Sequence, residues 1–324
     1  MGNDKLTKME KYWILYDVGN SAFTLLVSTI IPIYFNALAG NAGISEVDYL
    51  AYWGYAASIS TVIVAILGPT MGTVADTRNY KKPLFVFFMM IGVIGCAALS
   101  VPVSWIVFLV VFVIAKVGYN ASLIFYDSML VDVTTPERMD KVSSHGYAWG
   151  YIGSCIPFII SLVFVLMYES IGITMNTAMM LAFLLNAAWW VLMTLPLLKN
   201  YRQKNFAAPP EHPIKDSVIR LGHTLRDIKK EKKIFLYLLA FFFFIDGVYT
   251  IIEMATAYGS ALGLDTTGLL LALLVTQIVA FPCALIFSKF SKRYETTKLI
   301  KVCIAAYTLI ALFAIQLDKQ WEFW

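Results

Sequence analysis

The chain has 324 residues, of which 59% are hydrophobic and only 14% are charged. Charged residues make up about 25% of an average soluble protein, so this composition excludes an ordinary soluble domain and predicts a membrane protein. The net charge of +4 comes from short basic strips separated by apolar stretches. A nucleic-acid-binding surface needs a contiguous basic patch, so no nucleic-acid partner is expected.

Nine apolar stretches, each near the length that crosses a bilayer, follow one another along the chain. Every second polar strip between them is basic, and these strips hold 23 of the 25 Lys and Arg residues. Because basic loops stay in the cytoplasm during insertion, we predict a multi-pass protein of the bacterial inner membrane or cell membrane, with a cytoplasmic N-terminus. The expected spans are 12–38, 51–75, 83–100, 105–128, 143–168, 176–198, 234–257, 267–288 and 299–317.

A basic turn with the sequence GTVADTRNYKK follows the second span. Its glycine permits close helix approach, its aspartate lies where the span ends, and its three bases can pair with an acid. An ion pair at this rim can close one conformation and open in the other, so we predict a gating role. The alternative is a turn that only sets topology. The candidate gating residues are Gly72, Asp76, Arg78, Lys81 and Lys82.

Small side chains within the spans are interpreted as packing residues. Gly146, Gly150 and Gly153 give the fifth span one flank on which another helix can pack closely. The four cysteines lack the spacing typical of a disulfide or a metal site. No cluster of His, Cys and carboxylates has ligand spacing, so neither a metal nor a cofactor is expected.

The longest polar segment follows six spans and precedes three. After Pro213 it has apolar residues at helical spacing with bases on the other face, which predicts an amphipathic helix lying on the lipid bilayer. A plain tether between two halves is an equal alternative. We therefore divide the chain into a six-span half (1–198), a cytoplasmic linker (199–233) and a three-span part (234–324). A weak echo of the basic turn at 288–293 favours two related halves.

Four ionisable residues lie at membrane depth, where each charge costs about 3 kcal/mol on insertion scales. They are typical of a polar cavity for a solute or a coupling proton, and structural ion pairs such as Lys116 with Asp246 are the alternative. Asp127 and Asp132 lie nearer the cytoplasm and are interpreted as solvated. With two neighbouring amides, the candidate cavity residues are Asp17, Asn20, Lys116, Asn120, Asp246 and Glu253.

Three motifs resemble those of the Unknown Major Facilitator family, which is related to the yeast vacuolar effluxer that returns amino acids after autophagy. They lie at 16–23 (YDVGNSAF), within 119–138 (YNAS, FYDS and TPER) and within 142–153. The basic turn also resembles the superfamily signature between helices 2 and 3, although Thr77 and Asn79 replace the usual Arg and Gly. The resemblance implies the major facilitator fold, in which helices 1, 4 and 7 line the central cavity. A full member has twelve spans, whereas nine are predicted here. We therefore expect this chain to be a fragment that ends after the ninth span.

The function expected from these features is secondary active transport of a small polar solute by alternating access, with amino acids as one option and proton coupling as another. The alternatives are a non-transporting receptor or regulatory subunit derived from a transporter, or an inactive fragment. An intramembrane enzyme is not expected, because Asp246 and Glu253 are two helical turns apart, too far for a shared-proton dyad. The sequence leaves the oligomeric state open.

Overall fold

The computed structural model describes residues 5–101, 104–207, 219, 222–223, 226–228, 230–290 and 294–324. Within these ranges nine helical segments are long and apolar enough to cross a membrane, and no extended strand occurs. The predicted all-α multi-pass fold is therefore confirmed. Most of the predicted amphipathic helix after Pro213, and half of the echo at 288–293, lie outside the described residues. The spans are Lys8–Asn41, Glu46–Ala75, Lys81–Ala98, Trp105–Val133, Pro136–Leu166, Met175–Asn200, Lys232–Ala261, Thr266–Phe287 and Thr297–Ala314.

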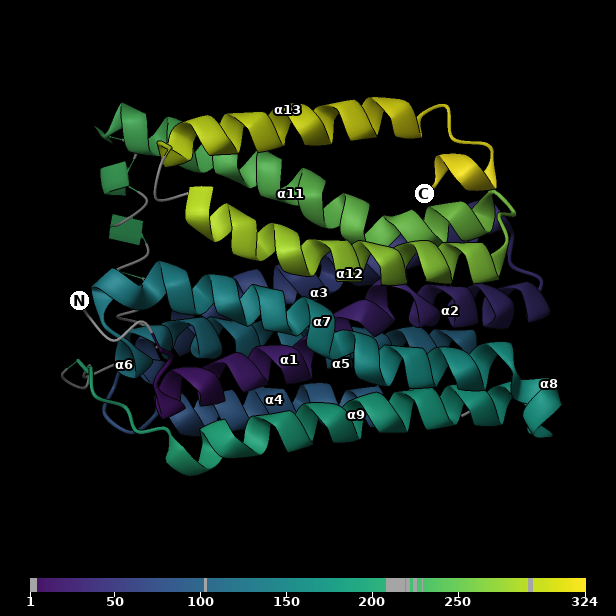
Figure 1. Cartoon of the computed structure of the whole chain (residues 1–324), viewed down its shortest axis with the longest axis horizontal. Coiled ribbons are helices and arrows are strands. Elements are labelled where there is room, and N and C mark those ends of the chain that lie inside the picture. The colour runs from purple at the N-terminus through teal and green to yellow at the C-terminus, as the bar shows by residue number, and fades with distance from the viewer. Residues whose placement is uncertain are drawn as a thin grey trace.

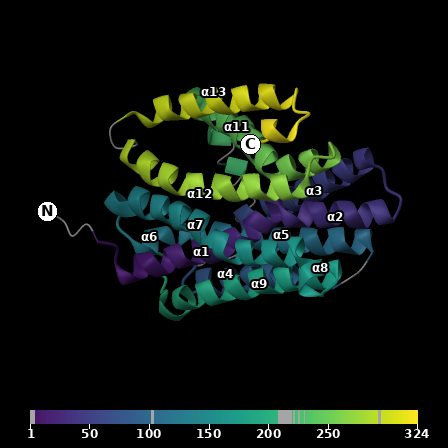
Figure 2. The ribbon, with the colours of Figure 1, turned by 45° about the vertical axis from the view of Figure 1, so that its right-hand side comes forward.

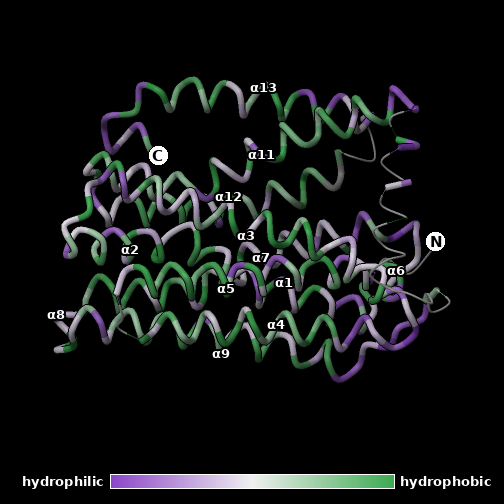
Figure 3. Tube along the Cα trace, turned by 180° about the vertical axis from the view of Figure 1, so that it is seen from behind, coloured by the Kyte–Doolittle hydropathy of each residue, from purple (hydrophilic) through white to green (hydrophobic). Residues whose placement is uncertain are grey.

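The helices lie side by side along one direction (Figure 1). Hydrophobic residues occupy their lengths, while hydrophilic residues gather toward the ends of the bundle (Figure 3). The chain is thus an integral, multi-pass membrane protein. The elements are α1 (Lys8–Ser28), α2 (Ile30–Asn41), α3 (Glu46–Ala75), α4 (Lys81–Ala98), α5 (Trp105–Ser128), α6 (Leu130–Val133), η1 (Pro136–Arg138), α7 (Met139–Leu166), α8 (Tyr168–Ile171), α9 (Met175–Asn200), α11 (Lys232–Ala261), α12 (Thr266–Phe290), α13 (Thr296–Ala314) and η2 (Gln320–Glu322).

The first six spans form one bundle in which α1 packs against α7 and α9, and α5 packs against α3 and α4. The glycine flank of α7 is the surface that receives α1. A Cβ added at Gly146 would lie 2.8 Å from Asp17 Oδ2, and one at Gly150 would lie 2.7 Å from Ser21 Oγ. The two helices therefore approach closely only because these positions of α7 carry no side chain.

The first span is broken near its middle. Thr29 separates α1 from α2 with φ −131° and ψ −84°, outside the helical range. Pro32, three residues later, has no backbone N–H and cannot donate to the Ser28 carbonyl four residues before it. That carbonyl is therefore available to a partner on another helix.

The last three spans lie on one side of this bundle, with α13 outermost (Figures 1 and 2). Helix α12 packs along α7, and α11 contacts α2 and α3. We call the end of the bundle that holds residues 76–80, 134–138 and 201–207 the basic end, and the opposite end, where Glu46, Glu169 and other acids lie, the acidic end. Helix α11 meets the six-span bundle near the acidic end and runs away from it toward the basic end (Figure 1).

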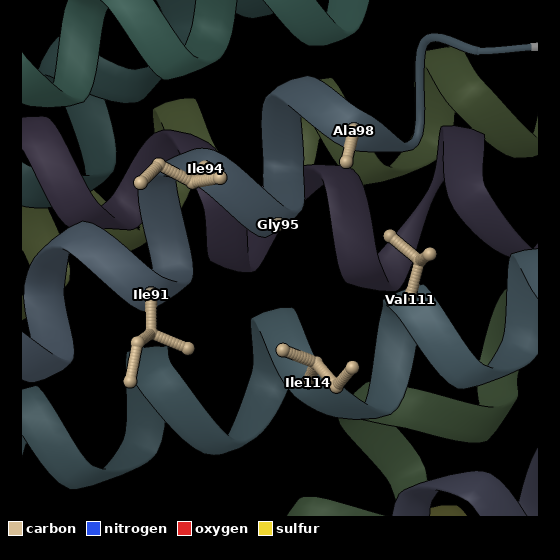
Figure 4. A pocket seen from close by; sticks show the side chains of 6 residues that line it. All are labelled: Ile91, Ile94, Gly95, Ala98, Val111 and Ile114. Carbon is tan, nitrogen blue, oxygen red and sulfur yellow. The ribbon is translucent and has the colours of Figure 1, made fainter.

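A groove of about 250 Å³ opens between α4 and α5 (Figure 4). All of its lining residues are apolar, and the exposed Ile94 and Ile114 lie at its edge. It offers no polar group to a solute, so we place the candidate site elsewhere. The lining consists of Ile91, Ile94, Gly95, Ala98, Val111 and Ile114.

Candidate functional site

Lys116 of α5 and Glu253 of α11 form an ion pair that joins the six-span half to the last three spans. Lys116 is only 2% exposed, and its ammonium lies 5.9 Å from the centroid of the Phe112 ring. A buried ammonium needs a compensating charge, because transfer from water to the bilayer interior is costly. The acid that supplies this charge is Glu253, and not Asp246, which the sequence offered as its partner.

Three further bonds link the same face of α11 to the six-span half. Their α11 residues are spaced by three and four positions, so they share one side of the helix. We call these bonds and the Lys116–Glu253 pair the α11 seal. The bonds run from Trp53 Nε1 to the Glu253 carbonyl (3.2 Å), from Thr256 Oγ1 to the Ser28 carbonyl, and from Asn36 Nδ2 to Ser260 Oγ (2.8 Å).

The helix break in the first span contributes directly to this seal. The Ser28 carbonyl, which Pro32 cannot engage, accepts the Thr256 hydroxyl from α11. A continuous helix would have used that carbonyl internally. Because of the break, the Ser28 carbonyl of the first span can accept a hydrogen bond from α11, the seventh span.

Asp17 is buried on α1 beside the glycine flank of α7. Asn20 lies one turn later and donates from Nδ2 to Asp17 Oδ1 at 3.3 Å and to the Tyr16 carbonyl at 3.0 Å. This contact places the predicted pair of Asp17 and Asn20 on one face. Among the described residues no base forms an ion pair with Asp17. Its carboxylate is therefore available to a cation or a proton.

A second carboxylate, Asp127 of α5, lies within electrostatic range of Asp17. Asp127 is exposed, and both it and Asp17 interact with Tyr147 of α7, while Tyr249 of α11 interacts with Asp127. Polar groups of α1, α5, α7 and α11 are thus close enough to influence one another electrostatically. The exposure of Asp127 agrees with its interpretation as a solvated acid. Its electrostatic influence on Asp17 could not be predicted from the sequence, because the two residues are 110 positions apart (127 minus 17).

Two other candidates have a different environment. Asp246 is exposed, and no hydrogen bond or ion pair to it is found in the described part of the chain. Asn120 is half-buried, and the adjacent Tyr119 shares a 2.6 Å hydrogen bond with Thr24 of α1. The structure therefore brings together Asp17 with Asn20 and Lys116 with Glu253. Among the described residues, neither Asp246 nor Asn120 forms a hydrogen bond or ion pair with either pair.

The family-like motifs of the first and fourth spans meet along the α1–α5 contact. Trp13 stacks on Tyr126 with ring centroids 4.3 Å apart, and each side chain also donates to the other residue's carbonyl. Tyr16 and Ser122 share a 2.7 Å hydrogen bond deeper in the bundle. These motifs therefore form one aromatic and hydroxyl-rich wall that fixes the helix carrying Asp17 against the helix carrying Lys116.

The basic turn between α3 and α4 forms a different ion pair from the one anticipated. Lys81 is buried and pairs with Asp132 of α6 at 3.3 Å, whereas the side chain of Asp76 is exposed. Arg78 lies over the Phe206 ring, with its guanidinium carbon 5.3 Å from the centroid. A Cβ at Gly72 would meet nothing within 4 Å, so the close helix approach expected at this glycine is absent. Lys82 is half-buried, and no salt bridge to it is found in the described ranges.

Asn79 explains how the turn tolerates the loss of the usual glycine. Its φ is +68°, in the left-handed region that Gly adopts freely and that Asn enters more readily than other side chains. Asn79 therefore adopts a backbone conformation that a glycine at this position would also allow.

Two buried carboxylates at the basic end were missed from the sequence. Glu10 accepts two 2.8 Å hydrogen bonds from Arg138, at Nε and at a terminal nitrogen, and a 2.7 Å bond from Thr134. Its Thr7-x-x-Glu10 spacing is a capping-box signature that the sequence does display. Asp132 carried no comparable signal, because most of its partners come from residues beyond α9.

No group of three or more His, Cys, Asp and Glu side chains that could hold a metal ion comes together in the described ranges. The charged groups that the structure does describe are two carboxylates, Asp17 and Asp127, with no ion pair to a described base, and the Lys116 ammonium paired with Glu253. Such groups can bind charge reversibly.

Comparison with known proteins agrees with this architecture. The family model described as "Vacuole effluxer Atg22 like" matches residues 7–136 and 131–324. The chain is 40% identical over 325 residues to the uncharacterized MFS-type transporter YxiO of Bacillus subtilis (strain 168), an alignment that covers 99% of this chain and 76% of that protein.

Two fungal proteins are more distant relatives. The chain is 22% identical to Autophagy-related protein 22 of Coccidioides immitis and to Autophagy-related protein 22-1 of Penicillium rubens, over 83% and 84% of its length. These alignments cover 55% and 58% of the fungal proteins. The resemblance seen in the sequence motifs is confirmed: the chain belongs to the vacuole effluxer Atg22-like family of the major facilitator superfamily, whose members are transporters and not enzymes.

Proposed function

We propose that this protein moves a small polar solute across the membrane by alternating access, as a secondary active transporter. The observation that carries the proposal is that acidic side chains and the Lys116–Glu253 ion pair both lie where the six-span half meets α11. Asp17 and Asp127 influence one another electrostatically where α1, α5, α7 and α11 carry polar groups, and the α11 seal joins α11 to the six-span half nearer the acidic end. In the proposed mechanism these carboxylates face a binding space that the α11 seal closes at one end, as alternating access requires.

The conformation corresponds to one half of such a cycle. The α11 residues from Glu253 to Ser260 contact the six-span half, whereas the side chains nearer the basic end, such as Leu236 and Phe243, are exposed. With the basic loops in the cytoplasm, as the charge asymmetry favours, this is an inward-facing state. Transport would then require the α11 seal to open and the basic end to close around Arg78 and Lys82. These residues belong to the basic turn of residues 72–82, which we call the gating turn.

The charges suggest the chemistry of the solute. Asp17 lacks a basic partner among the described residues, so it suits a protonated amine or a coupling proton, with Asn20 as a neighbouring hydrogen-bond donor. Lys116 suits an anionic group once Glu253 has moved away with α11. A zwitterion such as an amino acid meets both requirements, and the vacuolar effluxer relatives are consistent with such a solute.

The test is uptake and efflux of labelled amino acids in cells and in proteoliposomes under an imposed pH gradient. Asp17→Asn, Lys116→Ala and Asp246→Asn should each lower the flux at least about tenfold while the protein still reaches the membrane. Asp140→Asn, which alters an exposed acid at the start of α7, is the matched control and should leave flux unchanged.

Each outcome separates the proposal from its alternatives. Normal flux in all three variants would refute the cavity assignment. Loss of flux in Asp17→Asn and Lys116→Ala but not in Asp246→Asn would confine the cavity to the groups that the structure brings between the helices. Solute binding to the purified protein without any flux would favour a transporter-derived receptor.

A further inference from the structure

Residues 201–207 leave the end of α9 and run across the basic end of the six-span half. We call this segment the strap. Ala207 forms an isolated parallel β-bridge with Thr77, in the turn between α3 and α4. The strap therefore reaches from the end of α9 to the turn between α3 and α4.

Asp132 is the main anchor of the strap, and it is 2% exposed. Its Oδ1 accepts hydrogen bonds from the Lys204 backbone N–H at 3.1 Å, and from the Asn205 backbone N–H and side chain at 2.8 and 2.9 Å. Its Oδ2 accepts the Tyr201 hydroxyl at 2.6 Å and faces the Lys81 ammonium. Burial and the Asp132 charge both raise the pKa of Tyr201, so its hydroxyl remains a donor at any physiological pH.

The far side of the strap is anchored on the gating turn. The Ala207 N–H donates to the Asp76 carbonyl at 2.8 Å, and Gln203 Nε2 donates to the Ala75 carbonyl at 3.1 Å. Phe206 lies under the Arg78 guanidinium. These contacts satisfy carbonyls at the end of α3 that would otherwise lack partners.

Release of the strap would be costly at Asp132 in particular. Four of its five donors belong to residues 201–205, and without them a buried carboxylate would retain Lys81 alone. An under-satisfied buried charge is strongly unfavourable, so the strap and Asp132 stabilise one another.

We infer that the strap is a permanent brace of the six-span half. It joins the ends of α3, α4, α6 and α9 into one body. The device does not depend on which solute is moved, nor on the residues assigned to the cavity. It also holds Arg78 of the gating turn against the six-span half in every state of the protein.

The first experiment measures the docking itself. Thr77→Cys and Ala207→Cys are introduced together in a background whose four native cysteines are replaced. Bridge partners in adjacent strands lie about 5 Å apart, within the range of disulfide geometry. We expect near-complete cross-linking by a mild oxidant in native membranes, and little for Thr77→Cys with Glu231→Cys, whose second site lies beyond the strap.

The second experiment tests the anchor. Asp132→Asn should slow cross-linking of the 77–207 pair at least about tenfold, because Asn offers a weaker acceptor and turns a donor toward Lys81. Asp140→Asn, an exposed acid nearby, should not change the rate. Tyr201→Phe, which removes a single hydroxyl, should slow it less and serves in place of Asp132→Asn if that variant does not accumulate.

The third experiment tests permanence, by hydrogen exchange on the oxidised and reduced forms of the 77–207 pair. We expect equal exchange in the α11 peptide that contains Thr256, because opening of the α11 seal should not require the strap to leave. Slower exchange there in the oxidised form would overturn the inference, and so would failure of the pair to cross-link or an unchanged rate in both Asp132→Asn and Tyr201→Phe.

Discussion

Replacement of Glu253 by Gln should open the α11 seal. The substitution keeps the shape of the side chain but removes the only acid that pairs with Lys116 among the described residues. Breaking a buried ion pair from one side, or leaving a charge unmatched at membrane depth, costs about 3 kcal/mol. That cost disappears when α11 moves away and water reaches the ammonium, so the ratio of closed to open protein should fall about 100-fold.

The effect should be unequal for the two partners. Lys116 is almost fully buried, whereas the Glu253 side chain is 22% exposed. Lys116→Met therefore leaves a carboxylate that water can reach, and we expect a loss of only about 1 kcal/mol. The double variant Lys116→Met with Glu253→Gln has no unmatched charge and should recover most of the closed state.

The assay is the rate at which a maleimide labels Ala257→Cys in purified protein in nanodiscs. Ala257 is fully buried within the seal, so its labelling reports opening whichever way the protein faces. Glu169→Gln, at an exposed acid of the same end, is the control. A wild-type labelling rate in Glu253→Gln, or a double variant that labels as fast as Glu253→Gln, would refute this account of the ion pair.

Three other outcomes follow from the structure. Gly146→Val should sharply reduce the yield of folded protein in size-exclusion chromatography, since its Cβ would lie 2.8 Å from Asp17 Oδ2, whereas Gly72→Ala should be tolerated. Asn79→Ala should lower stability by about 1 kcal/mol in thermal unfolding, and Asn79→Gly should not, because φ is +68°. In intact cells an impermeant maleimide should label Val47→Cys but not Glu231→Cys, and the reverse pattern would overturn the topology argument.

The sequence by itself determined the class of the protein and the number and order of its spans. Hydropathy and basic-loop alternation are local properties of a chain inserted in a bilayer, so they can be read without knowledge of packing. The glycine flank of the fifth span was predictable for the same reason, since small residues at helical spacing define a surface before its partner is known. The break at Thr29 was not predictable from the sequence. The hydropathy of an apolar segment is the same whether or not one of its carbonyls accepts a hydrogen bond from another helix.

Only the tertiary structure decided which charges meet. Asp246 and Glu253 lie on one helix two turns apart, and the tilt and axial position of α11 bring Glu253 to Lys116 and leave Asp246 exposed. Asp132 was interpreted as a solvated acid near a helix end, yet it is buried by four donors of the strap and by Lys81. Such pairings join residues that are distant in sequence, and they depend on how helices cross and where connecting segments run. Periodicity can place a charge on a helix face, but it carries no information about the partner that packing places opposite.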